Sequence, residues 1–236
     1  MVYIVSFIII LLIAISLRYN WWRKPQSNKK ARVLMYHSIS DHIGKEKHNK
    51  WRVKPKDFEK QMKWFVKNNW TSHTISEIAK LEKIPEKSFV ITFDDGFEDN
   101  YTNAFPVLGK YNIKSTIYLV PTQTTNHWEK NNTSSLSNLL NKEQILEMQE
   151  SGLVEFGAHT LSHINLSKID EEQLKEEVYS SKIEVEKLTQ TECEAFAYPY
   201  GKFDDKIVKM VKAAGYKNAT VVKRGLYEIN DDIFTI

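Results

Sequence analysis

Cysteine, glycine and proline are scarce in this chain of 236 residues. The single cysteine, Cys193, excludes an internal disulfide framework and a cysteine-rich zinc module. Only eight glycines and six prolines are present, which excludes a collagen-like or linker-like sequence. Hydrophobic residues make up 42% of the chain and aromatic residues 12%, so global disorder is excluded as well. The length fits one domain with its own core, with or without a short appendage.

Acidic residues are absent from the first 32 positions, which hold six of the 33 lysines and arginines. The remaining 204 residues carry the other 27 basic side chains and all 30 acidic ones, so the body is mildly acidic although the chain has a net charge of +3. A nucleic-acid-binding protein carries its positive charge on the folded surface. We therefore expect no nucleic-acid partner.

The N-terminal residues 1–17 have no charged side chain and only two serines. As a helix they would span about 26 Å, close to the hydrocarbon core of a bilayer at about 30 Å. Aromatic and then basic residues follow within positions 19–24, the order expected where a helix leaves a membrane. We expect a transmembrane anchor over residues 1–22. The alternatives are a signal peptide cleaved near residues 14–16, although its usual basic start is missing, and a buried core helix.

Short apolar runs alternate with amphipathic helical patterns from residue 32 onward. The runs show little polar–apolar alternation, which is typical of strands buried on both faces. The predicted strands cover residues 32–36, 70–75, 88–93, 115–120, 154–158, 195–198, 218–222 and 233–236. Such alternation predicts an α/β barrel or a doubly wound sheet.

Helical patterns cover residues 55–68, 171–188 and 205–214. Asp170, with Gln173 three residues later, is expected to cap the second helix, and Gly215 is expected to end the third. The polar segment 122–140 is predicted to be a long surface loop, of a kind that often borders an active site.

Polar residues directly follow four of the predicted strands. In a parallel sheet the carboxyl ends of all strands meet at one edge, where active sites form. The residues at these ends are His37, Asp94, Asp95, His159 and the turn Pro199-Tyr200-Gly201. Each of these residues is common in ordinary turns, but their joint placement at strand ends indicates an active site.

The histidines His159 and His163 are four residues apart, so on a helical turn both imidazoles would face one point. Two histidines with one carboxylate and open positions suit a catalytic Zn²⁺ or a similar ion. One of the two aspartates, Asp94 or Asp95, can bind the metal while the other acts as a base toward a metal-bound water.

At these residues the sequence resembles the polysaccharide deacetylases of the NodB-homology type, carbohydrate esterase family 4. The matches are Thr92-Phe93-Asp94-Asp95-Gly96 and His159-Thr160-Leu161-Ser162-His163, and the likeness extends over residues 31–236. The resemblance implies a distorted (β/α) barrel that removes acetyl groups from sugars. It implies Asp94 as general base and a divalent metal, Zn²⁺ with Co²⁺ or Ni²⁺ as alternatives, on Asp95, His159 and His163. It also implies an oxyanion contact from the backbone N–H of Tyr200.

The sequence departs from the family pattern in two places. The third motif usually starts with an arginine that orients the base, but Ala197 stands there, so Asp94 must be held differently. No histidine follows His163, so the usual C-terminal general acid is missing. Residues 35–38 and 196–201 resemble the subgroup that acts on poly-β-1,6-N-acetylglucosamine in biofilms. That likeness assigns His37 as the acid that protonates the leaving amine. The alternative is that His37 orients a ligand or the barrel rim.

We therefore predict an anchor (1–22), a basic linker (23–31) and a monomeric deacetylase domain (32–236) whose substrate is an acetylated polysaccharide. The alternatives are an O-acetyl esterase or small-amide hydrolase with the same site, and a membrane-tethered glycan-binding protein with impaired catalysis. Polymers of the envelope and of biofilms favour an extracytoplasmic body, which we expect. The basic flank favours the cytoplasmic side.

Overall fold

The computed structural model describes residues 2–19, 26–129 and 135–236. Seven strands in these residues form one parallel sheet in the order β1-β3-β4-β5-β6-β7, with β2 paired to β3. The strands are β1 (Arg32–Tyr36), β2 (Thr71–His73), β3 (Ser88–Phe93), β4 (Ser115–Leu119), β5 (Val154–Ala158), β6 (Ala195–Ala197) and β7 (Asn218–Thr220). The sequence predicted each of them, some at slightly greater length.

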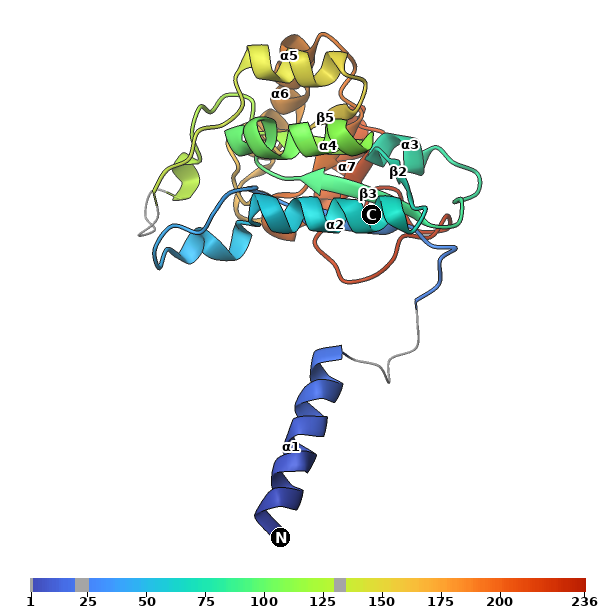
Figure 1. Ribbon diagram of the computed structural model, residues 1–236. Coiled ribbons are helices and arrows are strands. Elements are labelled where there is room, and N and C mark those ends of the chain that lie inside the picture. Colours follow the sequence, from blue (N-terminus) through green and yellow to red (C-terminus); the bar gives the residue numbers. More distant parts are fainter. Residues whose placement is uncertain (1, 20–25, 130–134) are drawn as a thin grey trace.

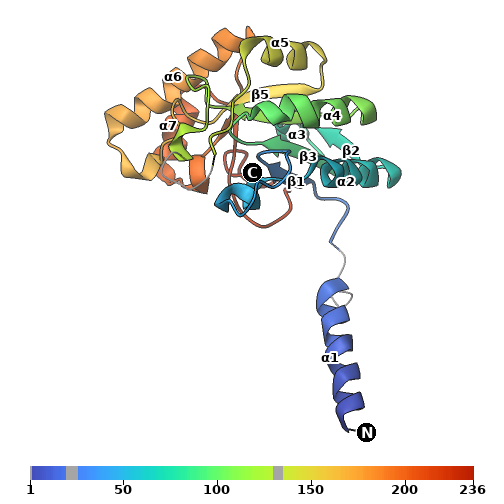
Figure 2. The same cartoon turned by 60° about the vertical axis from the view of Figure 1, so that its left-hand side comes forward.

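Most helices connect the strands and cover the outer side of the sheet, whereas Ile75 and Ile78 belong to a helix that packs on the opposite face (Figure 2). The α-helices are α1 (Val2–Tyr19), α2 (Pro55–Lys67), α3 (Ile75–Ala79), α4 (Phe105–Tyr111), α5 (Lys142–Glu150), α6 (Glu171–Thr189) and α7 (Asp205–Ala213). The shorter helices are η1 (Lys47–Trp51), η2 (Asn100–Ala104), η3 (His127–Glu129), η4 (Leu166–Lys168) and η5 (Pro199–Gly201). The patterns in the sequence predicted α2, α6 and α7 but did not single out α3, α4 or α5.

The predicted ends of two helices are confirmed. The Asp170 side chain accepts a hydrogen bond from the backbone N–H of Gln173 at 2.9 Å and caps α6. Gly215 follows α7 with a φ of 89°, a conformation in which glycine carries no steric cost. The segment 122–140 is a loop in its described part, apart from the short helix η3.

The sheet is buried on both faces. All six residues of β3 are buried, and side chains alternate between its faces. Phe89, Ile91 and Phe93 belong to the larger core cluster, together with residues of the outer helices such as Phe58. Val90 belongs to a second cluster on the opposite face. Burial on both faces explains why the strands read as continuous apolar runs.

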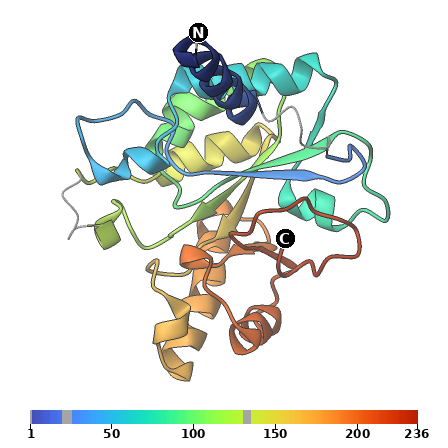
Figure 3. The same ribbon diagram turned by 90° about the horizontal axis from the view of Figure 1, so that it is seen from below.

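The sheet is a half-barrel, with β1 and β7 at its two edges. The C-terminal segment runs beside β1, where Ala31 and Tyr227 form an antiparallel bridge (Figure 3). The prediction of a strand over residues 233–236 is wrong. Ile236 exchanges backbone hydrogen bonds with residues of and next to β7, but the Asp232 side chain accepts from the Phe234 N–H and holds the segment in a turn.

The N-terminal helix α1 has no buried residue and stands apart from the α/β body in Figure 1. It has 18 residues and a mean hydropathy of 2.4, and within the described residues it is the one helix long and apolar enough to cross a membrane. A signal sequence near the N-terminus would have the same properties, so α1 is a candidate span. The aromatic and basic residues 21–24, which were expected to mark the membrane exit, lie outside the described residues.

Candidate active site

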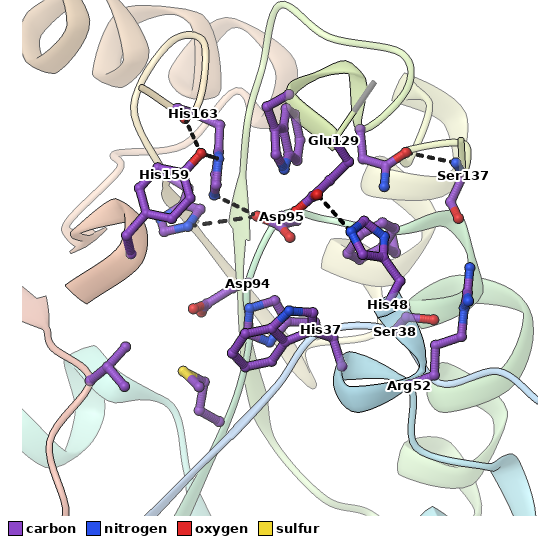
Figure 4. A pocket seen from close by; sticks show the side chains of 17 residues that line it. His37, Ser38, His48, Arg52, Asp94, Asp95, Glu129, Ser137, His159 and His163 are labelled. Atoms are coloured by element: carbon purple, nitrogen blue, oxygen red, sulfur yellow. Dashed lines mark hydrogen bonds and ion pairs between the residues drawn. The ribbon is translucent and has the colours of Figure 1, made fainter. Parts of the chain in front are cut away.

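A pocket of about 230 Å³ opens at the carboxyl edge of the sheet (Figure 4). The structure brings all six predicted site residues to its wall, although they come from four different strand ends and the turn after β5. They are His37, Asp94, Asp95, His159, His163 and Tyr200. Their meeting follows from the parallel sheet, which delivers every strand end to the same edge.

Asp95, His159 and His163 form a buried cluster whose candidate ligand atoms all lie within 4.8 Å of one another. Asp95 Oδ1 is 3.1 Å from His163 Nε2 and 3.7 Å from His159 Nε2. The same Oδ1 is buried and has no hydrogen-bond partner of good geometry among the described residues. A buried carboxylate oxygen facing two imidazole nitrogens is a donor set that fits a divalent metal ion.

The turn that carries the two aspartates is held in an unusual backbone conformation. Asp95 and Gly96 have φ angles of 72° and 71°. The positive φ favours glycine at Gly96, whereas a Cβ atom there would approach only the end of the Leu119 side chain, at 2.9 Å from Cδ2, which can shift. His163 and Tyr200 also have positive φ, at 59° and 60°. Such conformations concentrate at functional sites, where the surrounding structure enforces them.

Each histidine of the cluster is oriented through its second ring nitrogen. His159 Nδ1 lies 2.9 Å from the carbonyl oxygen of Ala197. Since a carbonyl only accepts, Nδ1 carries the proton and Nε2 directs its lone pair toward Asp95. His163 Nδ1 lies 3.1 Å from the Tyr200 hydroxyl, and its ring stacks on Trp128 with the centroids 4.4 Å apart. Both imidazoles are thus fixed in the orientation that a metal ligand needs.

Burial and neighbouring charges separate the pKa values of the acidic and basic groups. Burial lowers the pKa of His159 to about 3, so its imidazole is neutral near pH 7. Burial opposes ionisation of Asp95, but the adjacent His163 and the other histidines outweigh it and lower the pKa of Asp95. Burial and then the charge of Asp95 raise the pKa of Asp94 well above its usual value. Two adjacent carboxyls with oppositely shifted pKa values indicate different roles.

The family pattern places an arginine two residues before Pro199, where it orients the base. In this structure no other described basic residue contacts the Asp94 carboxylate in its place. Ala197 contributes only its carbonyl oxygen, which orients His159. Within the described ranges, the Asp94 carboxylate has no hydrogen bond or ion pair. Its place is set by its neighbours in the strand end, where the Asp94 N–H donates to the Tyr36 carbonyl at 2.9 Å.

His37 faces the pocket from the end of β1. Its ring stacks on Trp51, with the centroids 4.7 Å apart and the planes 28° apart. Burial lowers the pKa of His37, although the charge of Asp95 acts in the opposite direction. No described residue forms a hydrogen bond with the His37 ring, which lines the pocket.

The sequence analysis missed the wall of the pocket opposite the strand ends. Trp128 and Glu129 come from the loop after β4, and His48 and Trp51 come from η1. His48 Nε2 pairs with a Glu129 carboxylate oxygen at 2.6 Å, which joins the two segments. The predicted surface loop therefore does border the pocket. No periodicity marks these residues, and only the aromatic Trp128 in a polar loop gave a hint.

Known proteins share this fold and these motifs. The profile of the family described as polysaccharide deacetylase matches residues 82–219. The poly-β-1,6-N-acetyl-D-glucosamine N-deacetylase of Staphylococcus aureus strain MRSA252 is 30% identical over 213 residues, which are 86% of this chain and 70% of that protein.

Two solved structures are also similar. A polysaccharide deacetylase from Bacillus cereus is 31% identical with a TM-score of 0.72, and the match covers 88% of this chain but only 63% of that one. The Streptococcus pyogenes deacetylase PplD, solved with acetate, is 25% identical with a TM-score of 0.74, covering 87% and 89% of the two chains. With both motifs inside the matched region and the half-barrel in common, this chain belongs to the polysaccharide deacetylase family.

Proposed function

We propose that the protein is a metal-dependent deacetylase that hydrolyses N-acetyl groups of a polysaccharide containing N-acetylglucosamine. The observation that carries the proposal is the buried cluster of Asp95, His159 and His163 beside Asp94 on one pocket wall. The S. aureus relative named for poly-β-1,6-N-acetyl-D-glucosamine supports the choice of polymer.

The metal site would consist of Asp95 and the Nε2 atoms of His159 and His163. We propose Zn²⁺, with Co²⁺ or Ni²⁺ as alternatives, because imidazole nitrogen and carboxylate oxygen suit these ions. When bound, such an ion supplies Lewis acidity, which lowers the pKa of water and polarises a carbonyl group.

The other site residues move protons and stabilise charge. The Asp94 carboxylate takes a proton from the attacking water, whose oxygen bonds to the acetyl carbon, and the raised pKa of Asp94 makes it a stronger base. The backbone N–H of Tyr200 donates to the acetyl oxygen as negative charge develops there. The His37 ring gives a proton to the nitrogen as the carbon–nitrogen bond breaks. A free amine and acetic acid form, and the acid ionises to acetate and a solvent proton. Asp94 gives its proton back through solvent and His37 takes one up, which restores both groups.

The surroundings of the pocket favour a polymer over a small amide. Beyond Tyr200 and Trp128 the pocket adjoins an open hollow of about 640 Å³ that also includes Asn165 and Lys168. Aromatic side chains and polar groups along such a hollow suit sugar rings, which have apolar faces and hydroxyl edges. An O-acetyl esterase or a small-amide hydrolase with the same site remains the second candidate.

The test measures acetate release from β-1,6-linked N-acetylglucosamine oligomers and from acetylxylan by protein loaded with Zn²⁺. We expect release from the oligomers, and loss of both metal binding and release in Asp95→Ala and His163→Ala. His42→Ala, an exposed histidine outside the pocket, is the matched control. Release from acetylxylan alone would indicate an esterase. Oligomer binding without release in Zn²⁺ or Co²⁺ would indicate a glycan-binding protein with impaired catalysis.

We propose that residues 1–22 anchor the protein and that a linker at 23–31 joins them to the catalytic domain at 32–236, outside the cytoplasm. The apolar helix α1, which has no buried residue, supports an anchor. A substrate in envelope or biofilm polymers supports the exterior side. Protease digestion of intact cells should degrade the domain, and N-terminal sequencing should find residue 1 or 2. Protection would place the domain inside, and a start near residue 17 would indicate a cleaved signal.

We propose that the catalytic domain acts as a monomer, because one chain supplies every residue assigned to the site. Light scattering of the protein in detergent should give the mass of one chain. A larger mass that depends on concentration would contradict this.

A further inference from the structure

The short π-helix η2, which follows the Asp94-Asp95-Gly96 turn, holds the segment that carries His37. Asn100 Nδ2 donates to the His37 carbonyl oxygen at 2.8 Å. Asp99 accepts from the Ser38 hydroxyl at 2.5 Å and from the Ile39 N–H at 2.8 Å. Segments of the chain that are more than 60 residues apart are thereby joined directly beside the pocket. π-Helical turns are rare and occur frequently at functional sites.

Asn100 is fully buried, and its amide nitrogen forms hydrogen bonds while its amide oxygen forms none with a described residue. Nδ2 donates to His37 and, at 3.2 Å, to Asp99 Oδ1. Oδ1 is buried and has no hydrogen-bond partner among the residues that the structure describes. A buried acceptor without a partner destabilises the fold. Asn100 is therefore a poor choice for stability alone, and the donor bond to His37 is what the amide contributes.

The main chain at His37 is held by the Asn100 bond and by the backbone hydrogen bonds of its two neighbours. The Tyr36 carbonyl accepts from the Asp94 N–H at 2.9 Å, and the Ser38 N–H donates to a carbonyl of η1 at 3.3 Å. The Asn100 bond is the one that reaches the His37 carbonyl itself. The nitrogens of the His37 ring form no hydrogen bond with a described residue, and its ring contact is the stacking on Trp51. The position of the ring is thus set by that stacking and by the main chain at His37. A proton donor must lie within hydrogen-bond distance of the atom it protonates, and a misplacement of about 1 Å can cost about 100-fold in rate.

We propose that Asn100 is a positioning residue that fixes the main chain of His37, so that the imidazole can protonate the leaving nitrogen. This inference rests on the role proposed above for His37. The competing explanation is that Asn100 only stabilises the fold. The two differ in which substrates are affected, because only a poor leaving group needs the proton.

The experiment uses the protein loaded with Zn²⁺ and compares two substrates, one whose leaving group needs a proton and one whose leaving group does not. A β-1,6-linked N-acetylglucosamine pentamer releases an amine and needs an acid, whereas 4-nitrophenyl acetate releases an anion that leaves without a proton. For Asn100→Ala we expect kcat on the pentamer to fall at least about tenfold, with KM changed less than about twofold. Turnover of 4-nitrophenyl acetate should fall less than about threefold.

Asn103→Ala is the matched control. Asn103 lies in the same π-helix and its Nδ2 donates to the Ile39 carbonyl oxygen at 2.8 Å, so the variant loses an equivalent bond two residues away from His37. We expect it to lose similar stability and to keep kcat on the pentamer within about threefold. If Asn100→Ala fails to fold, Asn100→Leu keeps the side-chain size, removes the donor without burying a charge beside Asp99 and should show the same selective loss.

A double variant completes the test. In a His37→Ala background, Asn100→Ala should cause no further loss on the pentamer, because the group that it positions is gone. An equal loss on both substrates, or additive losses in the double variant, would overturn the inference. If His37→Ala alone leaves the pentamer rate unchanged, the acid role fails and the inference fails with it. Absence of acetate release from the wild-type protein would instead count against the proposed function.

Discussion

The Tyr200 hydroxyl offers a direct test of how the metal site is held. Tyr200→Phe removes the oxygen that lies 3.1 Å from His163 Nδ1 and leaves the ring, which packs edge-on against the imidazole with the centroids 4.7 Å apart. Loss of such an outer partner typically lowers metal affinity about 10- to 100-fold, because the imidazole is then less well oriented and less basic. We expect the dissociation constant for Zn²⁺ to rise at least about tenfold, or about 1.4 kcal/mol.

The folding stability of this variant should fall modestly. The variant has no hydroxyl, so His163 Nδ1 and the His163 carbonyl oxygen, which accepts from that hydroxyl at 3.3 Å, both lose a partner in a residue that is only 7% exposed. We expect the free energy of unfolding of the metal-free protein to fall by about 1–2 kcal/mol. The catalytic role proposed for Tyr200 belongs to its backbone N–H, so kcat at saturating Zn²⁺ should be retained.

The assay is a titration of metal-free protein with Zn²⁺ in competition with a chelator of known affinity, paired with urea denaturation. Tyr198→Phe is the control, because the buried Tyr198 hydroxyl donates to the Phe234 carbonyl at 3.2 Å and neither residue lines the active-site pocket. That variant should lose about 1 kcal/mol of stability and no Zn²⁺ affinity. An unchanged affinity in Tyr200→Phe, or an equal loss in both variants, would refute the reasoning.

Three further predictions follow from burial and packing. Asp94→Asn should abolish acetate release. It should also raise the unfolding free energy of the metal-free protein at pH 8 in urea denaturation, because burial raises the pKa of Asp94 and disfavours its ionised form as pH rises; a loss of stability would contradict this. The pKa of His159 is about 3 in the folded protein, below that of the unfolded chain at about 6.5, so the metal-free protein should lose up to about 1.4 kcal/mol per pH unit as pH falls from 6.5 to 4. His159→Gln should flatten that slope, and an equally steep slope in the variant would show that another group causes it. Gly157→Ala should cost about 1–3 kcal/mol in thermal unfolding, because its Cβ would lie 2.7 Å from the Ala195 carbonyl oxygen, whereas Gly109→Ala, with open space inside α4, should gain about 0.5–1 kcal/mol; equal effects would mean that the close approach is relieved by movement.

The fold class could be predicted because the relevant signals are local. Runs such as residues 88–93 are apolar throughout, and every residue of β3 is indeed buried. The helix α6 showed its stripe and its cap at Asp170. The eighth predicted strand failed because residues 233–236 are mostly apolar but begin in a turn, where the Asp232 side chain accepts from the Phe234 N–H. Composition alone does not report such a turn.

That the aspartates and histidines meet in one site could be predicted in the same way, since polar residues at parallel strand ends must share one edge. The hydrogen bonds and ion pairs that orient these residues could not be predicted. Ala197 orients His159 through a carbonyl oxygen that every residue possesses. His48 meets Glu129 across more than 80 residues of chain, and no periodic pattern marks either of them. Pairings of this kind depend on where loops pack, which is decided by the whole fold.

The sequence by itself determined the apolar N-terminal helix, the order of strands and helices, and the aspartates and histidines at the strand ends. These follow from chain-local hydrophobicity and from the geometry of parallel strands. Only the tertiary structure decided that Asp94 has no charged partner among the residues that it describes, that Tyr200 supports His163 through its hydroxyl, and that Asn100 supports the main chain of His37. The physical reason is that side-chain hydrogen bonds act over about 3 Å, so they form only between groups that the complete packing of the chain brings together.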